Sequence, residues 1–90
     1  MGNSRKVFTK ELTEDTFEVN ASNGFQRFSI YNSSSVTGTF QGDAVADGEP
    51  STAIDVAQNE TAVVDVGNGY VIDYLLVTAP ASCTLKIMGS

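Results

Sequence analysis

Few residues in this chain are of the types that carry out chemistry. Its 90 residues include one cysteine, Cys83, and no histidine. The chain therefore lacks the commonest general base and the commonest metal ligand, and one thiol makes neither a thiolate zinc site nor an intrachain disulfide. Glycine-rich phosphate-binding motifs and the Gly-x-Ser-x-Gly motif are also missing. We expect a protein that is not an enzyme and that uses no cofactor.

Carboxylates are the most abundant charged groups, and their arrangement does not favour catalysis. Asp43, Asp47 and Glu49 lie within seven residues and would offer oxygen ligands to a calcium ion. Their spacing lacks the dense Asp-x-Asp-x-Asp-Gly pattern, so a solvated loop is the favoured interpretation and we predict no metal site. Glycosidic cleavage by paired carboxylates normally needs aromatic platforms, and the chain has no Trp.

Tyrosines and basic side chains are the residues best suited to contact another molecule. A tyrosine buries a flat ring while its hydroxyl stays hydrated, which suits a protein interface or, alternatively, stacking on a sugar. Three of the five basic residues lie in the first ten positions and form a basic N-terminal arm. We predict a partner interface made by Arg5, Lys6, Lys10, Tyr31, Tyr70 and Tyr74.

The charge distribution limits the kinds of partner. The net charge is −6, and residues 11–90 carry two basic against eleven acidic side chains, a net charge of −9. Binding to a phosphate backbone needs clustered Lys and Arg, so nucleic acid is not an expected partner. No segment is long and apolar enough to span a bilayer, so we expect no membrane association. The basic arm suits docking on an acidic neighbour.

The hydrophobic pattern predicts an all-β protein. Cys83, Leu85 and Ile87 alternate with polar neighbours, which indicates a strand with one covered face. No segment has a helical period. Eight short segments separated by turn signals predict a single small antiparallel β-sandwich, jelly-roll-like or immunoglobulin-like, over residues 7–90, preceded by an arm over residues 1–6. These segments are 7–12, 16–20, 25–32, 36–41, 51–57, 61–66, 70–78 and 83–88.

Two of the turns carry hairpin signals. Asn23-Gly24 tolerates the positive φ angles of a tight turn, and residues 79–82 separate the last two apolar segments. The segment 70–78 is apolar on both faces, so we expect it to be covered on both, by its own sheet layer or by another chain. Asp73 interrupts that segment; it needs a partner such as Arg27 if its face is covered, or else lies exposed near an edge.

The second half of the chain resembles small β-sandwich structural proteins of tailed bacteriophages, including capsid decoration and auxiliary proteins. The residues that carry the resemblance are Ser51-Thr-Ala-Ile-Asp-Val, Asn59-Glu-Thr, and the stretch from Tyr70 to Ile87 with its Thr78-Ala-Pro-Ala-Ser-Cys-Thr-Leu-Lys-Ile tail. The resemblance covers roughly residues 25–88 and leaves out the N-terminal arm.

This resemblance implies a component of the virion, located on the capsid surface. Its partners would be the major capsid protein or other virion proteins, and such proteins are often trimeric, so it favours a homo-oligomer, with a trimer as the first expectation. The family has no catalytic or metal site to carry over. A carbohydrate-binding β-sandwich module is the alternative function.

Overall fold

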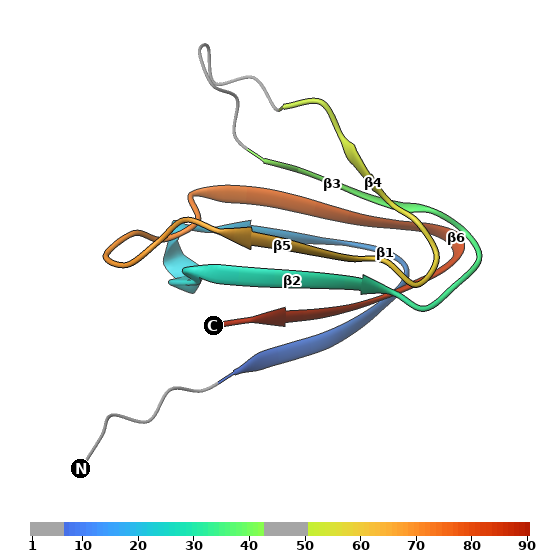
Figure 1. Cartoon of the computed structure of the whole chain (residues 1–90), viewed down its shortest axis with the longest axis horizontal. Helices are drawn as coiled ribbons and strands as arrows, with labels where there is room; N and C mark the ends of the chain where they lie inside the picture. Colours follow the sequence, from blue (N-terminus) through green and yellow to red (C-terminus); the bar gives the residue numbers. More distant parts are fainter. Residues whose placement is uncertain (1–6, 43–50) are drawn as a thin grey trace.

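The computed structural model describes residues 7–42 and 51–90, which form one antiparallel sheet of six strands (Figure 1). The described residues contain no α-helix, only a single 3₁₀ turn at Ala21–Asn23. The all-β prediction is therefore confirmed. The strands are β1 (Phe8–Asn20), β2 (Arg27–Asn32), β3 (Gly38–Gly42), β4 (Ile54–Val56), β5 (Thr61–Asp65) and β6 (Tyr74–Gly89).

The two longest strands, β1 and β6, form a bent ribbon that organises the sheet. They pair along their whole length, from Phe8 opposite Gly89 to Asn20 opposite Tyr74. The register breaks in the middle, where Glu14 alone stands opposite residues 80–83. Glu14 and Ser82 both have left-handed backbone angles there, with φ of 51° and 64°. The ribbon folds over at this bulge because the extra residues of β6 bend both strands.

The bend divides the sheet into two halves that face each other. In one half, which we call the β3–β4 half, the start of β6 pairs with the end of β1 and with β3, and β4 follows β3. In the other, the β2–β5 half, the end of β6 pairs with the start of β1 and with β2, and β5 follows β2. β1 is thus an edge strand in both halves.

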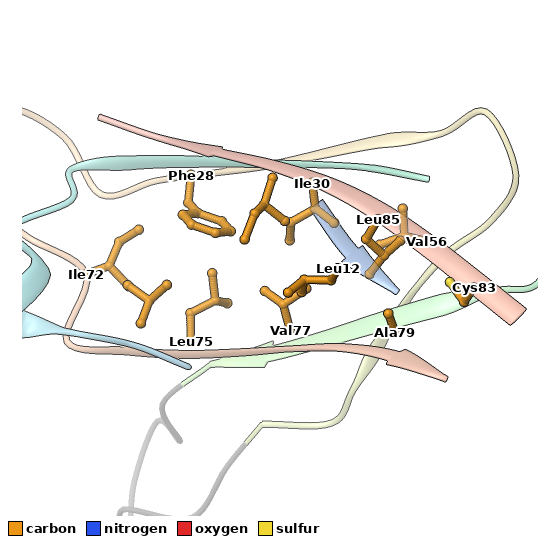
Figure 2. Close-up of a cluster of buried hydrophobic side chains, with 12 residues drawn as sticks. Leu12, Phe28, Ile30, Val56, Ile72, Leu75, Val77, Ala79, Cys83 and Leu85 are labelled. Carbon is orange, nitrogen blue, oxygen red and sulfur yellow. The ribbon is translucent and has the colours of Figure 1, made fainter. Parts of the chain in front are cut away.

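The hydrophobic core fills the space between the two halves (Figure 2). Phe28, Ile30 and Leu85 project into it from the β2–β5 half, opposite Leu75 and Val77 from the β3–β4 half. All five are at most 2% exposed, and alternation in the sequence had placed Leu85 on a covered face. Cys83 is fully buried as well, which confirms its expected role as a small apolar filler.

A ring of four phenylalanines closes one end of the core. Phe8 stacks on Phe17 with 5.3 Å between ring centroids, and Phe25 lies 5.5 Å from Phe8 and 5.8 Å from Phe28. Phe17 completes the ring at 6.2 Å from Phe28. Phe8 and Phe17 lie on either side of the bend in β1, so these aromatic contacts help to hold the two halves together.

The strand count differs from the predicted eight because the bend does not interrupt the strands. Segments 7–12 and 16–20 are both parts of β1, and segment 83–88 continues directly from 74–78 in β6. The hairpin predicted at residues 79–82 is therefore wrong. Those residues form the bulge of the ribbon, so the two apolar segments lie end to end in different halves instead of pairing with each other.

The hairpin predicted at Asn23-Gly24 is also wrong, although the chain does turn there. β1 and β2 are not partners, since β1 pairs with β6 and β2 pairs with β5 and β6. The Asn20 carboxamide oxygen accepts a hydrogen bond from the Ser22 backbone N–H at 3.0 Å, and Gly24 has φ of 71°. This capped 3₁₀ turn carries the chain from one half of the sheet to the other.

The segment 70–78 is covered on one face and only partly on the other. Its inward residues Leu75 and Val77 are buried, whereas the outward Tyr74 and Leu76 are half-buried. Residues 70–73 precede β6 and form no strand. Within one chain, the expected cover on both faces is therefore incomplete.

Candidate protein-interaction surfaces

The basic residues predicted for the interface do not form a cluster in the part of the chain that the structure describes. Lys10 is exposed at the edge of β1, and its Nζ lies 5.5 Å from the centre of the Phe17 ring. This cation–π contact places Lys10 over the rim of the core. Arg5 and Lys6 lie outside the described residues, as do Asp43, Asp47 and Glu49 of the acidic loop.

The three predicted tyrosines lie apart. Tyr31 is on the outer face of the β2–β5 half, because it alternates with the buried Ile30 and Asn32 of β2. Tyr74 is on the outer face of the β3–β4 half, on the opposite side of the molecule. Tyr70 is 69% exposed in the segment between β5 and β6. The structure therefore does not bring the tyrosines together into one aromatic platform.

The best-defined surface is the outer face of the β2–β5 half, which we call the Tyr31 face. The register places its side chains in rows that cross β1, β6, β2 and β5. One row holds Thr9, Met88, Ser29 and Val63; the next holds Glu11, Lys86, Tyr31 and Thr61; Arg27 and Asp65 lie beyond the first row.

Apolar side chains lie at the centre of the Tyr31 face. Met88 and Val63 are each 48% exposed, and the half-buried Tyr31 lies in the next row. The Tyr31 hydroxyl is 3.4 Å from the Asn59 carboxamide oxygen, which fixes the end of the ring. Shallow hollows of about 560 Å³ and 200 Å³ lie on this face, beside Tyr31 and beside Arg27. Exposed Tyr and Met are the residue types that protein interfaces favour.

A third hollow opens between the free edges of the two halves. It has a volume of about 360 Å³ and runs from Phe40 on β3 to Val64 on β5. Three of its apolar lining residues are exposed: Ile54 at 55%, Val71 at 43% and Val66 at 40%. Asp73, also exposed at this hollow, lies near an edge as one of the two sequence interpretations expected.

Neither surface has the features of a metal or catalytic centre. Across residues 7–42 and 51–90, no three His, Cys, Asp or Glu side chains gather closely enough to hold a metal ion. Nor does this part of the chain contain a helix with the length and apolarity needed to cross a membrane. Comparison with known proteins finds no matching family model, curated protein or solved structure. Function is therefore argued from the residues themselves.

The Tyr31 face is a feature that the sequence analysis did not identify as a site. Its signal was present in the outward positions of three separate strands, at residues 9 and 11, 29 and 31, and 86 and 88. Alternation shows that each pair faces outward, but only the sheet register shows that the pairs are neighbours.

Proposed function

We propose that this chain is a non-enzymatic virion structural protein, a capsid decoration or auxiliary protein that binds the outer capsid surface and stabilises it. The observation that carries the proposal is the exposed apolar centre of the Tyr31 face, which lies on the surface outside the buried core. The resemblance of residues 25–88 to phage decoration proteins supplies the class of partner. We interpret the two facing halves as a small β-sandwich, with eight strand segments if the halves of β1 and β6 are counted separately.

The proposed binding acts through burial of apolar area between neighbouring subunits. Each apolar side chain removed from water contributes roughly 1.5–3 kcal/mol, and Met88, Val63 and Val71 all have exposed area left to bury. The basic residues Arg5 and Lys6 add attraction to acidic neighbours. In this proposal the chain assembles as a homo-oligomer on the capsid, with a trimer around a local symmetry axis as the favoured arrangement.

The alternative of a carbohydrate-binding module loses its main support. Sugar binding of that type rests on aromatic rings that share one face, and Tyr31 and Tyr74 lie on opposite outer faces. A protein interface needs no such platform.

Immunogold electron microscopy of purified native virions tests the proposed location. Antibodies raised against the purified chain should label the outside of intact capsids. Virions that carry no copies of the chain, or label that appears only after the capsids are opened, would contradict it.

The arm is tested by a variant with both arm charges reversed, Arg5→Glu with Lys6→Glu. It should bind purified capsids at least tenfold more weakly than the unaltered chain, because attraction to an acidic surface becomes repulsion. The variant Arg5→Lys with Lys6→Arg is the matched control, since it alters the same two positions and keeps both charges. Equal binding by the reversed variant would contradict the role of the arm.

A further inference from the structure

We propose that the Tyr31 face is a two-fold contact between two copies of this chain. This goes beyond the proposed function, because it names a surface and a partner for the free chain in solution; on a capsid, the same face would exchange this contact for one with a neighbouring subunit. The argument rests on the charge balance of the face, on the positions of its charges in the sheet register, and on its apolar centre.

Charge makes this face the one on which a second copy can approach without net repulsion. In residues 7–42 and 51–90 there are three basic side chains, and two of them, Arg27 and Lys86, are on this face. Glu11 and Asp65 balance them, so the face is neutral. The remaining described surface carries six acidic side chains and Lys10, a net charge of −5. Within the described surface, this is therefore the face on which two identical acidic molecules meet with the least repulsion.

The register makes the four charges self-complementary. Lys86 and Asp65 are separated by two strands across the sheet and by two rows along it. Glu11 and Arg27 are separated by the same steps in the same direction. A two-fold axis can lie in the plane of the face and run diagonally across it, between Lys86 and Asp65 and between Glu11 and Arg27. Rotation about this axis exchanges the position of Lys86 with that of Asp65, and the position of Glu11 with that of Arg27. It places Lys86 against the second copy's Asp65 and Arg27 against the second copy's Glu11, within about 3 Å on regular sheet spacings.

The same axis brings the apolar side chains together. With regular spacing of strands and rows, the two-fold axis places Val63 of one copy opposite Tyr31 of the other. It also brings the Met88 side chains of the two copies together. The four charged pairs of the dimer then flank the apolar contacts on two opposite sides. The hollow beside Tyr31 has room for the second copy's apolar side chains. The strands of the two copies cross at a large angle, as in orthogonal sheet packing.

The area of the face sets the strength of the contact. Four strands about 4.8 Å apart and three rows about 6.8 Å apart give roughly 400 Å² per copy. The two copies together would bury roughly 800 Å², which is below the size of a standard specific interface and in the range of weak, transient contacts. We therefore expect a weak, reversible dimer with a dissociation constant of roughly 10⁻⁴ M.

Sedimentation equilibrium on the purified full chain tests the contact. The chain should be a dimer at about 1 mM and a monomer at about 1 µM. The single variants Lys86→Glu and Asp65→Lys should each raise the dissociation constant by about tenfold or more, since each reverses two symmetry-related pairs. An equimolar mixture of the two variants should form a heterodimer, because each reversed residue then meets a residue of opposite charge.

Two double variants separate contacts between copies from contacts within one chain. Lys86→Glu with Asp65→Lys restores both pairs between copies and should dimerise, whereas Lys86→Glu with Glu11→Lys preserves the cross-strand pair within the chain and should not. Circular dichroism confirms that each variant is folded. A wild-type chain that stays monomeric at 1 mM, a trimer as the limiting species, or the opposite behaviour of the double variants would overturn the proposal. None of these results depends on whether the chain binds capsids.

Discussion

Asn32 is a fully buried polar side chain whose hydrogen bonds connect three parts of the fold. Its Nδ2 donates to the backbone oxygens of Val36 and Val56 at 2.8 and 2.7 Å, and its Oδ1 accepts from the backbone N–H and the hydroxyl of Ser34. The Ser34 hydroxyl in turn accepts from the backbone N–H of Thr84. This network ties β2, the turn after it, β4 and β6 together.

Replacing Asn32 with leucine should destabilise the fold by about 2–4 kcal/mol, because buried carbonyl and amide groups lose their partners. Urea unfolding followed by circular dichroism measures the loss. Asn68→Ala is the matched control, since Asn68 accepts one exposed hydrogen bond from Gln26 and should change stability by less than about 0.5 kcal/mol. Equal stabilities of the two variants would show that the network contributes little.

Gly38 is required by close packing. A Cβ at this position would lie 2.8 and 2.9 Å from the two methyl carbons of Leu85, which is itself fully buried. Gly38→Ala should therefore cost about 1–3 kcal/mol. Leu85→Val removes a methylene and makes room for the added Cβ. The double variant Gly38→Ala with Leu85→Val should therefore lose less stability than the sum of the two single variants, as measured by urea unfolding. Additive losses of stability would contradict a direct clash.

At the residue scale the sequence predicts inward and outward positions well. Alternation placed Cys83, Leu85 and Ile87 on a covered face, and all three are buried. It assigned Asn32 to the boundary between a strand and a turn and could not show that its side chain is buried. That burial depends on Val56, 24 residues away in sequence.

The bend of the β1–β6 ribbon is the element that shapes the molecule. Because of the bend, β1 is an edge strand and β6 an inner strand in both halves. At the bend, Glu14 and Ser82 adopt left-handed backbone angles. Residues with a Cβ adopt such angles at a cost of roughly 1–2 kcal/mol.

The bend can be tested at Ser82. Ser82→Gly should leave the fold equally stable or slightly more stable, because glycine adopts a positive φ without strain. Ser82→Val should lower stability by about 1–2 kcal/mol, since a β-branched side chain is poorly tolerated there. Thermal unfolding measures both variants, with Ala81→Val as the neighbouring exposed control. A valine variant as stable as the glycine variant would contradict the strained bend.

At the element scale the sequence was less informative. Both incorrect hairpin predictions came from turn signals that are physically sound, because the chain does change direction at residues 20–24 and 79–82. Turn residues specify that the chain bends. They do not specify which strands pair afterwards, because pairing depends on contacts between β1 and β6 that lie up to 81 residues apart.

At the scale of the whole molecule, the fold places balanced charges and exposed apolar side chains together on one face. The Tyr31 face is neutral and has an apolar centre, whereas the remaining described surface is acidic. This distribution suits a small protein that stays soluble through its charge and associates through one face. The sequence gives the overall charge, but only the register collects Glu11, Arg27, Asp65 and Lys86 on the same side.

A concentration series of two-dimensional amide NMR spectra tests most directly whether the molecule associates through the Tyr31 face. From about 10 µM to 1 mM, the account predicts that the signals of Tyr31, Val63 and Met88 shift together, while those of Ile54 and Val71 at the other hollow stay in place. Unchanged spectra over this range, or shifts confined to Ile54 and Val71, would contradict it.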